Sequence, residues 1–305
     1  MTNHIMNKVL KIHLVFLLIS LIGIKLVHAQ EDKISKKRII VICAHPDDAE
    51  ITSGGTSVLL SKLGYELKFV SVTNGNKGYY SGTKDEIAHR RYKEVQEVKK
   101  RLRCEYEILD NNDGELEAHL KNRMEIIRLI REWKADIVIT HPPYDYHPDH
   151  RYTSLLVQDA SFLVNVPHVL PHIPALNQSP LFLYTRGRYT NPIRPQPDIT
   201  IDITSVAKDK AYLIDAHVSQ VYEFLPWINK SKVHIPETKE GRLDYILKEY
   251  VLKRGTIQAY DREVVQKWYG QQSADVKTIE AFEICEFGRT VDDQDIRELF
   301  PMLKN

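Results

Sequence analysis

The sequence RIIVICAHPDDAE, residues 38–50, runs from an apolar segment into a polar one. Residues 39–44 are short and rich in β-branched side chains, which is typical of a buried strand. Pro46 suits the first position of a helix, where its missing N–H costs nothing. The carboxylates of Asp47 and Asp48 are favoured by the dipole at a helix N-terminus. The stretch therefore predicts a strand that ends where a helix begins, with a histidine and two aspartates at the junction.

Further strands and helices are predicted to alternate after this first strand. The strands are expected at 66–73, 105–109 and 135–141, and the helices at about 48–63, 84–103 and 120–133. This pattern predicts an α/β fold: a Rossmann-like, mostly parallel sheet with helices on both faces. Right-handed crossovers and the common strand order 3-2-1-4 place the first and fourth strands side by side. The loop 141–150, HPPYDYHPDH, is then expected to face the polar end of the first strand.

The second half of the chain is less regular. We expect a helix from about 149 to 164, a loop over the site at 166–180, strands at 181–184 and 198–203, and a helix at 205–217. From Glu237 onward the chain is charged and is predicted to be helical. Because no repeat, low-complexity tract or linker interrupts it, the chain from residue 30 to residue 305 is expected to form one domain.

The N-terminal residues have the pattern of a secretory signal peptide. An unbroken apolar run, 14–24, follows Lys8 and Lys11, and Val27 and Ala29 are small residues at the two positions that matter for cleavage before Gln30. The run is shorter than the about 20 residues that a spanning helix needs, so a signal peptide over 1–29 is preferred to an uncleaved anchor. No later segment is apolar enough to span a membrane. The mature protein is therefore predicted to be exported, periplasmic or extracellular.

Charge and cysteine content exclude two kinds of protein. The chain has 42 basic and 41 acidic residues, and removing the three lysines of residues 1–29 leaves 39 and 41. This balance gives no reason to expect nucleic acid or an anionic membrane surface as a partner. Three cysteines are too few for a disulfide framework. Cys43 is expected in the core, and a bridge between Cys104 and Cys285 stays open.

Two pairs of polar residues have the spacing of metal ligands. His45 and Asp48 are three residues apart, and so are His147 and His150. At a helix start, residues i and i+3 project to the same side, so the two pairs could face each other around one metal ion. Imidazole and carboxylate suit zinc, and three protein ligands leave a position for a water whose pKa falls to about 7. Asp47 could take the proton of that water.

The remaining polar groups offer further chemistry. Whichever of His147 and His150 does not bind the metal could polarise a substrate carbonyl or protonate a leaving amine, and Asp149 could orient that histidine. Taken singly, these residues have simpler interpretations as turns, helix caps or solvated side chains. Two such motifs at the ends of adjacent strands favour a metal hydrolase. No G-x-S-x-G elbow supports another nucleophile, and Gly54-Gly55 is more often a sign of close packing than of phosphate binding.

The motifs Ala44-His-Pro-Asp-Asp48 and His147-Pro-Asp-His150 resemble the two signatures of the PIG-L/LmbE-like zinc-dependent de-N-acetylases. That family includes enzymes acting on N-acetylglucosaminyl-inositol lipids and thiols, and chitobiose deacetylases. The similarity extends from about residue 38 to the end of the chain. It includes the R-x-x-E pattern from Arg91, the turn 109–114 and the segment 210–220.

The resemblance implies a role for each residue of the two motifs. His45, Asp48 and His150 would bind zinc, one ion per chain, with another divalent metal as an alternative. Asp47 would be the general base. His147 would stabilise the oxyanion and act as general acid. The implied reaction removes the acetyl group from an N-acetylated sugar, such as an N-acetylglucosamine-type glycan, glycolipid or glycoconjugate.

Four further residues are implied around the substrate. Arg91 would lie near the substrate end of the pocket, and Tyr144 or Tyr146 would help to hold the intermediate. His217 would line the site or cap its helix. Two other functions remain as alternatives: a metal-dependent hydrolase of another bond, such as a phosphoester, and a carbohydrate-binding protein without activity. The sequence leaves the oligomeric state and the particular N-acetyl sugar open.

Overall fold

The computed structural model describes residues 36–303. The predicted signal peptide, 1–29, lies outside the described residues. From Lys37 onward the chain clusters as one unit, and this unit has the predicted α/β architecture. Among the described residues, no helix has both the length and the apolar character that a membrane crossing requires.

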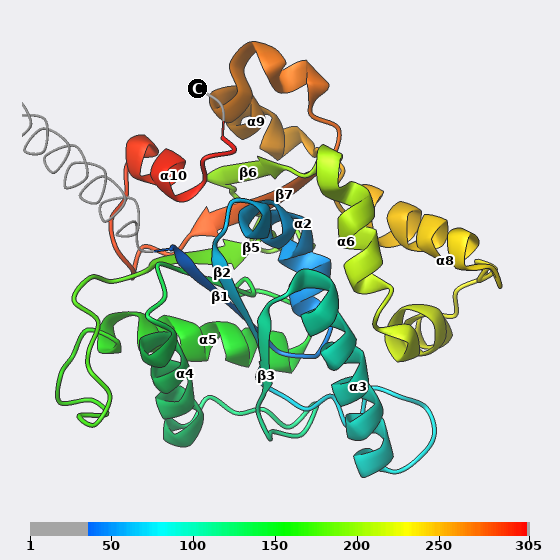
Figure 1. Cartoon of the computed structure of the whole chain (residues 1–305), viewed down its shortest axis with the longest axis horizontal. Helices are drawn as coiled ribbons and strands as arrows, with labels where there is room; N and C mark the ends of the chain where they lie inside the picture. Colours follow the sequence, from blue (N-terminus) through cyan, green and yellow to red (C-terminus); the bar gives the residue numbers. More distant parts are fainter. Residues whose placement is uncertain (1–35, 304–305) are drawn as a thin grey trace, which may run out of the picture. The chain divides into compact units, whose positions relative to one another are not determined.

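Within residues 36–303, a seven-stranded sheet has the order β3-β2-β1-β4-β5-β7-β6 (Figure 1). The strands are β1 (Arg38–Cys43), β2 (Glu66–Ser71), β3 (Glu105–Ile108), β4 (Ile137–Thr140), β5 (Leu181–Thr185), β6 (Ile199–Asp202) and β7 (Ile279–Ile284). β1 pairs in parallel with β2 and with β4, so that Ile40 lies opposite Lys68 and Val138. The predicted order 3-2-1-4 is confirmed. The loops that follow β1 and β4 therefore emerge at the same edge of the sheet.

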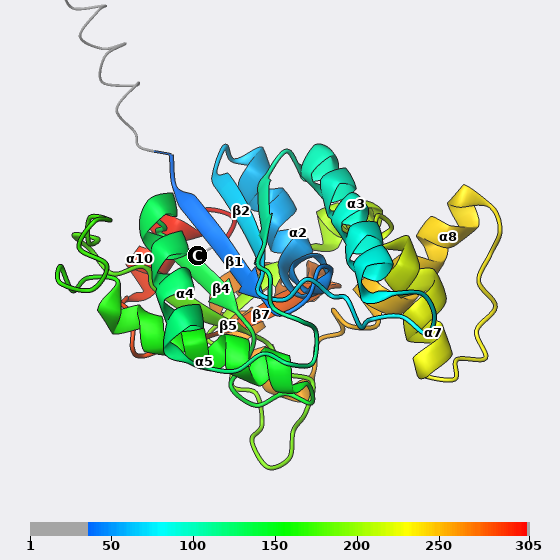
Figure 2. The same ribbon diagram turned by 90° about the horizontal axis from the view of Figure 1, so that it is seen from below.

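Helices cover both faces of this sheet, as predicted. They include α2 (Asp48–Lys62), α3 (Lys84–Leu102), α4 (Leu120–Trp133), α5 (Pro148–Leu163), α6 (Ala207–Ile214), α7 (Leu225–Ile228), α8 (Lys239–Ile246), α9 (Arg262–Tyr269) and α10 (Asp293–Leu299), with shorter or wider helical turns at η1 (Thr204–Val206), η2 (Ser219–Phe224), η3 (Leu247–Leu252), η4 (Ala259–Asp261) and η5 (Gly270–Asp275). Figure 2 shows α4 and α5 on one side of the sheet, and α2 and α3 on the other.

The buried first strand separates two hydrophobic clusters. Ile39 and Val41 pack into the cluster on the α2 and α3 side, whereas Ile40 and Ile42 pack against α4 and α5. This alternation is the period-2 geometry of a strand covered on both faces. All four side chains are fully buried, and each burial is worth about 1.5–3 kcal/mol. The apolar run thus fixes β1 at the centre of the sheet and places the polar residues after it at the edge.

One strand was not predicted. The segment from Glu237 was expected to be helical, but Ile279–Ile284 forms β7, which pairs antiparallel with both β5 and β6. Its sequence contains Glu and Ala, which favour helices in isolation, and pairing with two neighbouring strands overrides that preference. The buried Glu280 of β7 is satisfied by Lys210 of α6, whose Nζ lies 2.6 Å from Glu280 Oε1.

The loop 166–180 also lies elsewhere than expected. It is irregular, as predicted, but Arg131 near the end of α4 holds it. The buried guanidinium of Arg131 donates hydrogen bonds to backbone carbonyls that include those of Val166 and Ile173. The end of α4 is next to the start of β1, because Trp133 Nε1 donates to the carbonyl of Ile39. The loop is therefore at the amino edge of the sheet, away from the polar ends of β1 and β4.

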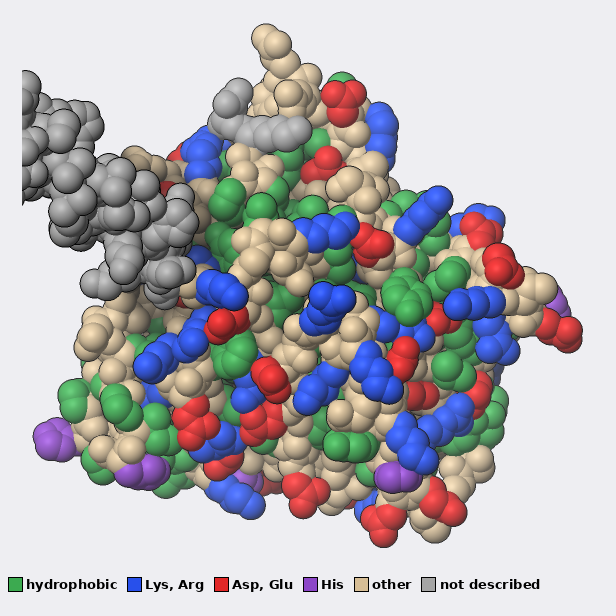
Figure 3. All heavy atoms as spheres, viewed as in Figure 1, with side chains coloured by type: hydrophobic (Ala, Val, Ile, Leu, Met, Phe, Trp, Pro, Cys, Tyr) green, Lys and Arg blue, Asp and Glu red, His purple; other side chains and the backbone are tan. Residues whose placement is uncertain are grey.

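Close packing explains the paired glycines of α2. A Cβ atom added to Gly55 would lie 2.7 Å from Ile203 Cγ2, and the Gly55 N–H donates to the buried Glu280 carboxylate at 2.8 Å. Because this N–H already donates to a protein carboxylate, the glycines agree with close packing and not with phosphate binding. The three cysteines are all buried and free, so the bridge that the sequence left open between Cys104 and Cys285 is not formed. On the face drawn in Figure 3, basic and acidic side chains are interspersed.

Candidate metal centre

The predicted motifs meet at the carboxyl edge of the sheet. Asp47 and Asp48 lie where β1 passes into α2, and His147 and His150 lie where β4 passes into α5. Because β1 and β4 are neighbouring parallel strands, the two helix starts face each other. The first start is fixed by the Asp48 carboxylate, which accepts the N–H of His45 at 2.8 Å.

Three ligand atoms form a nearly equilateral triangle. His45 Nδ1 is 3.3 Å from Asp48 Oδ2 and 3.2 Å from His150 Nε2, and the last two atoms are 3.4 Å apart. Tetrahedral zinc, with bonds of about 2.0–2.1 Å, separates its ligands by about 3.3–3.4 Å. The spacing and the donor types therefore fit one metal ion. The wider His/Asp cluster that could hold a metal consists of His45, Asp48, Asp113, His141, His147, Asp149 and His150.

Carboxylates hold the outward nitrogen of both triangle histidines. His45 Nε2 lies 3.2 Å from Asp149 Oδ2 and 3.3 Å from Asp113 Oδ1. His150 Nδ1 lies 3.1 Å from Asp145 Oδ1. When an imidazole donates its N–H outward to a carboxylate, its inward nitrogen keeps a lone pair for a metal. Both rings are thus arranged as metal ligands with supporting partners.

The charges around the triangle favour a cation. Burial disfavours the charged form of His45, but the carboxylates of Asp113 and Asp149 outweigh it and raise the pKa of His45 well above its usual range. Burial likewise opposes ionisation of Asp48, yet the neighbouring histidines, led by His150, hold the pKa of Asp48 well below its usual range. The metal-free cluster therefore keeps an ionised carboxylate and attracts positive charge, which a divalent cation can supply.

His141, which was not among the predicted site residues, packs against two of the three triangle residues, His150 and Asp48. Its ring stacks on His150 with centroids 4.0 Å apart and an interplanar angle of 7°. Its Nε2 accepts the N–H of Ala44 at 2.9 Å and lies 3.3 Å from Asp48 Oδ2. Burial and His150 lower the pKa of His141 to about 4. Because a backbone N–H uses the Nε2 lone pair, the neutral ring packs against the ligands and does not replace one.

Asp47 lies beside the triangle with a strained backbone. Its φ of 147° is rare for a residue other than glycine, and such strain persists only where the surroundings enforce it. Arg91 does so: its Nη2 lies 3.2 Å from Asp47 Oδ1 and donates to the carbonyl of Pro46. Burial raises the pKa of Asp47 to about 6, and Arg91 opposes the rise. Arg91 is only 2% exposed, so it orients Asp47 from within the protein and does not present its guanidinium at an open surface.

His147 is the most open histidine of the two motifs. Its Nδ1 accepts the N–H of Asp149 at 3.2 Å, so the neutral ring carries its proton on Nε2. Burial, together with His45 and His150, lowers the pKa of His147 and favours that neutral form. The ring makes a T-shaped contact with His45 at 4.5 Å. His147 therefore lies next to the triangle with an N–H available.

Of the two candidate tyrosines, Tyr146 lies at the cluster. Its ring centroid is 5.4 Å from that of His150. Tyr144 makes no ring contact with a histidine among the described residues. Tyr146 also lies 6.2 Å from Tyr189, in the loop that follows β5. That loop, and not 166–180, borders the site.

Asp149 orients a different histidine from the one expected. From the sequence, Asp149 was predicted to orient whichever of His147 and His150 does not bind the metal. Its Oδ2 instead lies 3.2 Å from His45 Nε2 and 4.0 Å from His147 Nδ1. The same carboxylate accepts the N–H of Gly114 at 2.7 Å. Asp149 thus joins the turn after β3 to the ring of His45.

His217 lies beneath the site and not on its surface. Its side chain is fully buried, and its Nε2 is 3.2 Å from Oε1 of the equally buried Glu50, in the first turn of α2. Burial disfavours the imidazolium, but the Glu50 carboxylate outweighs it and raises the pKa of His217. The sequence suggested that His217 lines the site or caps its helix; the structure places its side chain against Glu50, inside the protein.

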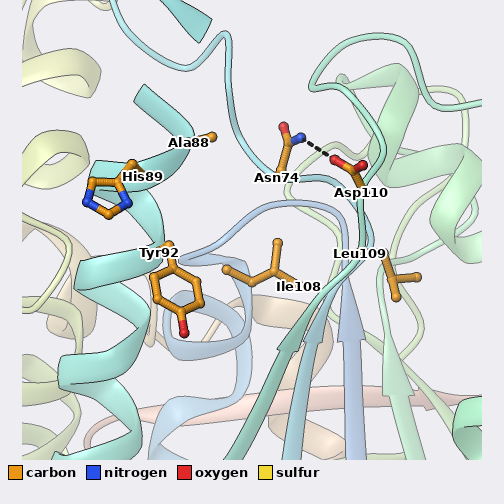
Figure 4. A pocket seen from close by; sticks show the side chains of 7 residues that line it. All are labelled: Asn74, Ala88, His89, Tyr92, Ile108, Leu109 and Asp110. Carbon is orange, nitrogen blue, oxygen red and sulfur yellow. Dashed lines mark hydrogen bonds between the residues drawn. The ribbon is translucent and has the colours of Figure 1, made fainter. Parts of the chain in front are cut away.

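A separate hollow lies at the carboxyl end of β3 (Figure 4). Its volume is about 260 Å³, and it is lined by Asn74, Ala88, His89, Tyr92, Ile108, Leu109 and Asp110. Asn74 Nδ2 donates to Asp110 Oδ1 at 3.2 Å, as drawn in Figure 4. The hollow shares no lining residue with the His/Asp cluster.

Three residues of the site were missed by the sequence analysis. His141 ends the predicted fourth strand, Asp113 lies in the turn 109–114, and Asp145 lies in the second motif loop. A usable signal was present, because each follows a predicted buried strand at the edge where ligands bind. The sequence does not show which of several polar residues on such a loop points inward, since that depends on contacts between segments far apart in the chain.

Comparisons with known proteins agree on one family. Residues 40–161 match the model of the family described as PIG-L, GlcNAc-PI de-N-acetylase. Diacetylchitobiose deacetylase of Thermococcus kodakarensis is 29% identical over 193 residues, which cover 61% of this chain and 71% of that protein. A Bacillus cereus protein described as a probable N-acetyl-alpha-D-glucosaminyl L-malate deacetylase 2 is 25% identical over 202 residues. These residues cover 62% of this chain and 86% of that protein.

Solved structures share the fold. A 4-carboxy-2-hydroxymuconate hydratase of Pseudomonas putida has a TM-score of 0.65 at 21% identity, covering 84% of this chain and 99% of that one. N,N'-diacetylchitobiose deacetylase of Pyrococcus horikoshii has a TM-score of 0.59 at 23% identity, and the match covers 82% of this chain and 84% of that one. The segment that matches the family model contains both metal-type motifs, and the sequence relatives include two deacetylases. Residues 40–161 form a PIG-L family domain, and the relatives support a PIG-L/LmbE-like de-N-acetylase.

Proposed function

We propose that this protein removes the acetyl group from an N-acetylated sugar, with one zinc ion held by His45, Asp48 and His150. The triangle of ligand atoms, with edges of 3.2–3.4 Å, carries the proposal. These three distances match those between ligands of tetrahedral zinc, and the fourth ligand position stays open for water or substrate. When bound there, zinc would lower the pKa of a coordinated water and polarise the amide carbonyl.

Asp47 is the proposed general base. Its carboxylate is buried beside the triangle and oriented by Arg91, 3.2 Å away. With a pKa of about 6, the carboxylate is mostly ionised at neutral pH and its basicity is close to the working pH. This combination is what proton abstraction requires.

His147 is the proposed donor to the developing oxyanion and to the leaving amine. Its Nδ1 accepts a backbone N–H, which leaves the proton on Nε2. One ring nitrogen of each of His45, His147 and His150 lies within 4.8 Å of the other two, so His147 is close enough to contact a substrate group at the metal. Tyr146, whose ring contacts that of His147, is the better placed of the two tyrosines to assist.

The substrate class follows from the family and from the predicted export. The deacetylases named above act on N-acetylated sugars according to their descriptions. The proposed export would bring this protein to the periplasm or outside the cell, where glycans and glycoconjugates are available. We therefore propose an N-acetylglucosamine-type glycan or glycoconjugate as the substrate. Zinc is the proposed metal, although the donor set also suits other divalent ions.

The test is acetate release from a panel of N-acetylated sugars by purified residues 30–305. The protein is assayed after removal of its metal and again after zinc is restored. Chelator-sensitive release that returns with zinc, and that Asp47→Ala removes, is the expected result. Absence of release from every amide, with zinc bound stoichiometrically, would refute the proposed reaction.

The same panel distinguishes the other functions. Release of phosphate from phosphoesters without release of acetate would favour a hydrolase of another bond. A hydratase shares the fold. If the protein added water to the double bond of an unsaturated carboxylic acid and released no acetate, that class would be favoured. Sugar binding without turnover, in metal-free protein, would favour a carbohydrate-binding protein.

A further inference from the structure

Four aromatic side chains form a partly exposed cluster where the loop before α3 meets η2 and α7. Tyr79 and Tyr80 belong to the loop before α3, and Phe224 and Trp227 belong to η2 and α7. The ring centroids of Tyr79 and Tyr80 are 4.2 Å apart and stacked, Tyr80 and Trp227 are 5.1 Å apart, and Phe224 and Trp227 are 6.1 Å apart. Trp227 is 55% exposed and Tyr80 48% exposed. Figure 2 shows the loop before α3 reaching α7.

Gly78 connects this aromatic cluster to the metal centre. It is so close to two site residues that an added Cβ would lie 2.9 Å from Arg91 Nη1 and 3.3 Å from Asp113 Oδ2. Its carbonyl accepts a hydrogen bond from Gln220 Nε2 at 2.9 Å. The loop that bears the tyrosines and the segment that bears Phe224 are therefore fixed at the same residue. The first ring, Tyr79, is the next residue in the chain.

The rings are held in place by polar contacts. Arg90 forms a two-point ion pair with Glu223, with both nitrogen–oxygen distances at 2.7 Å. The Tyr79 hydroxyl donates to the same carboxylate, and the Arg90 guanidinium lies 5.2 Å from the centre of the Tyr79 ring. The Tyr79 and Tyr80 hydroxyl oxygens are 3.0 Å apart. Rings fixed in this way lose little conformational entropy when a ligand covers them.

A large exposed aromatic cluster indicates a ligand or partner surface. This one combines apolar ring faces with hydroxyl, carboxylate and guanidinium groups at their borders. A pyranose ring has the complementary chemistry, because it presents an apolar C–H face and an edge of hydroxyl groups. Aromatic faces with a few fixed polar groups are the usual lining of small-molecule sites. The ion pair of Arg90 with Glu223, partly exposed at this border, offers hydrogen-bonding groups that suit sugar hydroxyls better than a lipid surface.

We propose that the aromatic cluster binds a neighbouring sugar unit of a glycan whose N-acetyl sugar occupies the metal centre. The inference rests on the proposed function and narrows it: the preferred substrate is an oligosaccharide or longer glycan, and not a free monosaccharide. Trp227 and Tyr80 supply the exposed ring faces. Tyr79, held by Glu223, directly follows Gly78, the residue that contacts the site.

The test compares substrates of different length. Acetate release is measured with N-acetylglucosamine and with its β-linked trimer and tetramer, for the zinc-loaded wild type and for Trp227→Ala and Tyr80→Ala. We expect the wild type to prefer the oligomers, and each variant to lose about tenfold in kcat/KM on them, mostly through KM. The loss should be absent with the monosaccharide. Phe162→Ala, at a 72% exposed aromatic residue on α5 outside the cluster, is the matched control and should behave as wild type.

The outcomes separate this inference from the proposed function. Oligomer turnover that is equal in the wild type and both variants would overturn the inference and leave deacetylation standing. The inference would also be overturned if Trp227→Ala kept its turnover of oligomers but lost binding to phosphatidylethanolamine–phosphatidylglycerol vesicles, which would indicate a lipid surface. Dissociation of a dimer in sedimentation, again with turnover kept, would indicate a contact between two copies of the chain. Absence of acetate release from every sugar tested would contradict the proposed function itself, and the inference with it. Calorimetric binding of the tetramer to zinc-loaded Asp47→Ala, weakened when Trp227→Ala is added, would support the inference without relying on turnover.

Discussion

His45 and His150 are each held at both ring nitrogens, and this double contact is what makes them suitable ligands. One nitrogen of each ring belongs to the triangle and the other faces a carboxylate. The carboxylate fixes the tautomer and the ring orientation, so the metal need not order the side chain when it binds. The site is therefore largely preformed at the level of single residues.

The partner of His150 offers a test of this preformed state. Asp145→Asn should weaken zinc binding by about 10- to 100-fold, because the amide is a poorer acceptor for the outward N–H. The affinity is measured by competition with a chromophoric chelator. Asp159→Asn is the control, since Asp159 is a carboxylate on α5 paired with Arg123 at 2.7 Å. Equal zinc affinity in both variants would mean that Asp145 does not support the ligand.

Asp47 and His150 should separate catalysis from metal binding. Asp47→Ala should keep stoichiometric zinc and lose activity by about 10²- to 10⁴-fold, the usual contribution of a general base. His150→Ala should lose the metal, because it removes one corner of the triangle. Zinc content by atomic emission and acetate release by coupled assay are the two measurements. Loss of zinc in Asp47→Ala would show that the ligands are wrongly assigned, and Asp47→Asn controls for the missing side-chain volume.

At the scale of elements, the sequence predicted the half of the sheet in which each crossover is a helix. The alternation of apolar runs with helical segments, combined with right-handed crossovers, was enough to place β1 beside β4. That adjacency brings the two motifs together. The sequence motifs identified only some of the site residues. His45, Asp48 and His150 belong to the motifs, whereas His141 directly follows β4 and Asp113 lies in the turn after β3.

The parts that sequence reasoning missed depend on tertiary contacts. β7 forms because β5 and β6 offer it hydrogen-bonding edges on both sides, and no local pattern reveals that. The loop 166–180 is held at the far edge by Arg131, a residue over thirty positions earlier in the chain. A charged residue in an amphipathic helix is usually solvated, so its role as an anchor was not visible from periodicity.

The glycine pair of α2 provides a stability prediction at this scale. Gly54→Ala should raise the free energy of unfolding by up to about 1 kcal/mol, because its Cβ would make ordinary contact, 3.5 Å from Lys210 Cγ, in a helix interior. Gly55→Ala should lower the free energy by about 1–3 kcal/mol, since its Cβ would lie within 3.0 Å of three Ile203 atoms. Urea unfolding of the two variants measures both. Similar values for the pair would mean that α2 can shift away from Ile203 without cost.

At the scale of the whole molecule, folding and metal binding are linked. The triangle joins the starts of α2 and α5, so a metal bound there stabilises only the folded chain. At a free zinc concentration of about 100 times Kd, the gain is about 2.7 kcal/mol. For a domain of this size that corresponds to a rise in Tm of about 5 °C. Calorimetric melting of the metal-free protein, with and without added zinc, checks this expectation.

The rise in Tm should also depend on pH, in a direction set by His45. The pKa of His45 is raised well above its usual range because carboxylates, led by Asp113, outweigh the opposing effect of burial. Zinc binds the neutral ring, so it must displace a proton, and protons compete more strongly as the pH falls. The zinc-induced rise in Tm should therefore be smaller at pH 6 than at pH 8. His150→Ala should show no rise at either pH, and a rise in that variant equal to that of the wild type would place the stabilising metal outside the triangle.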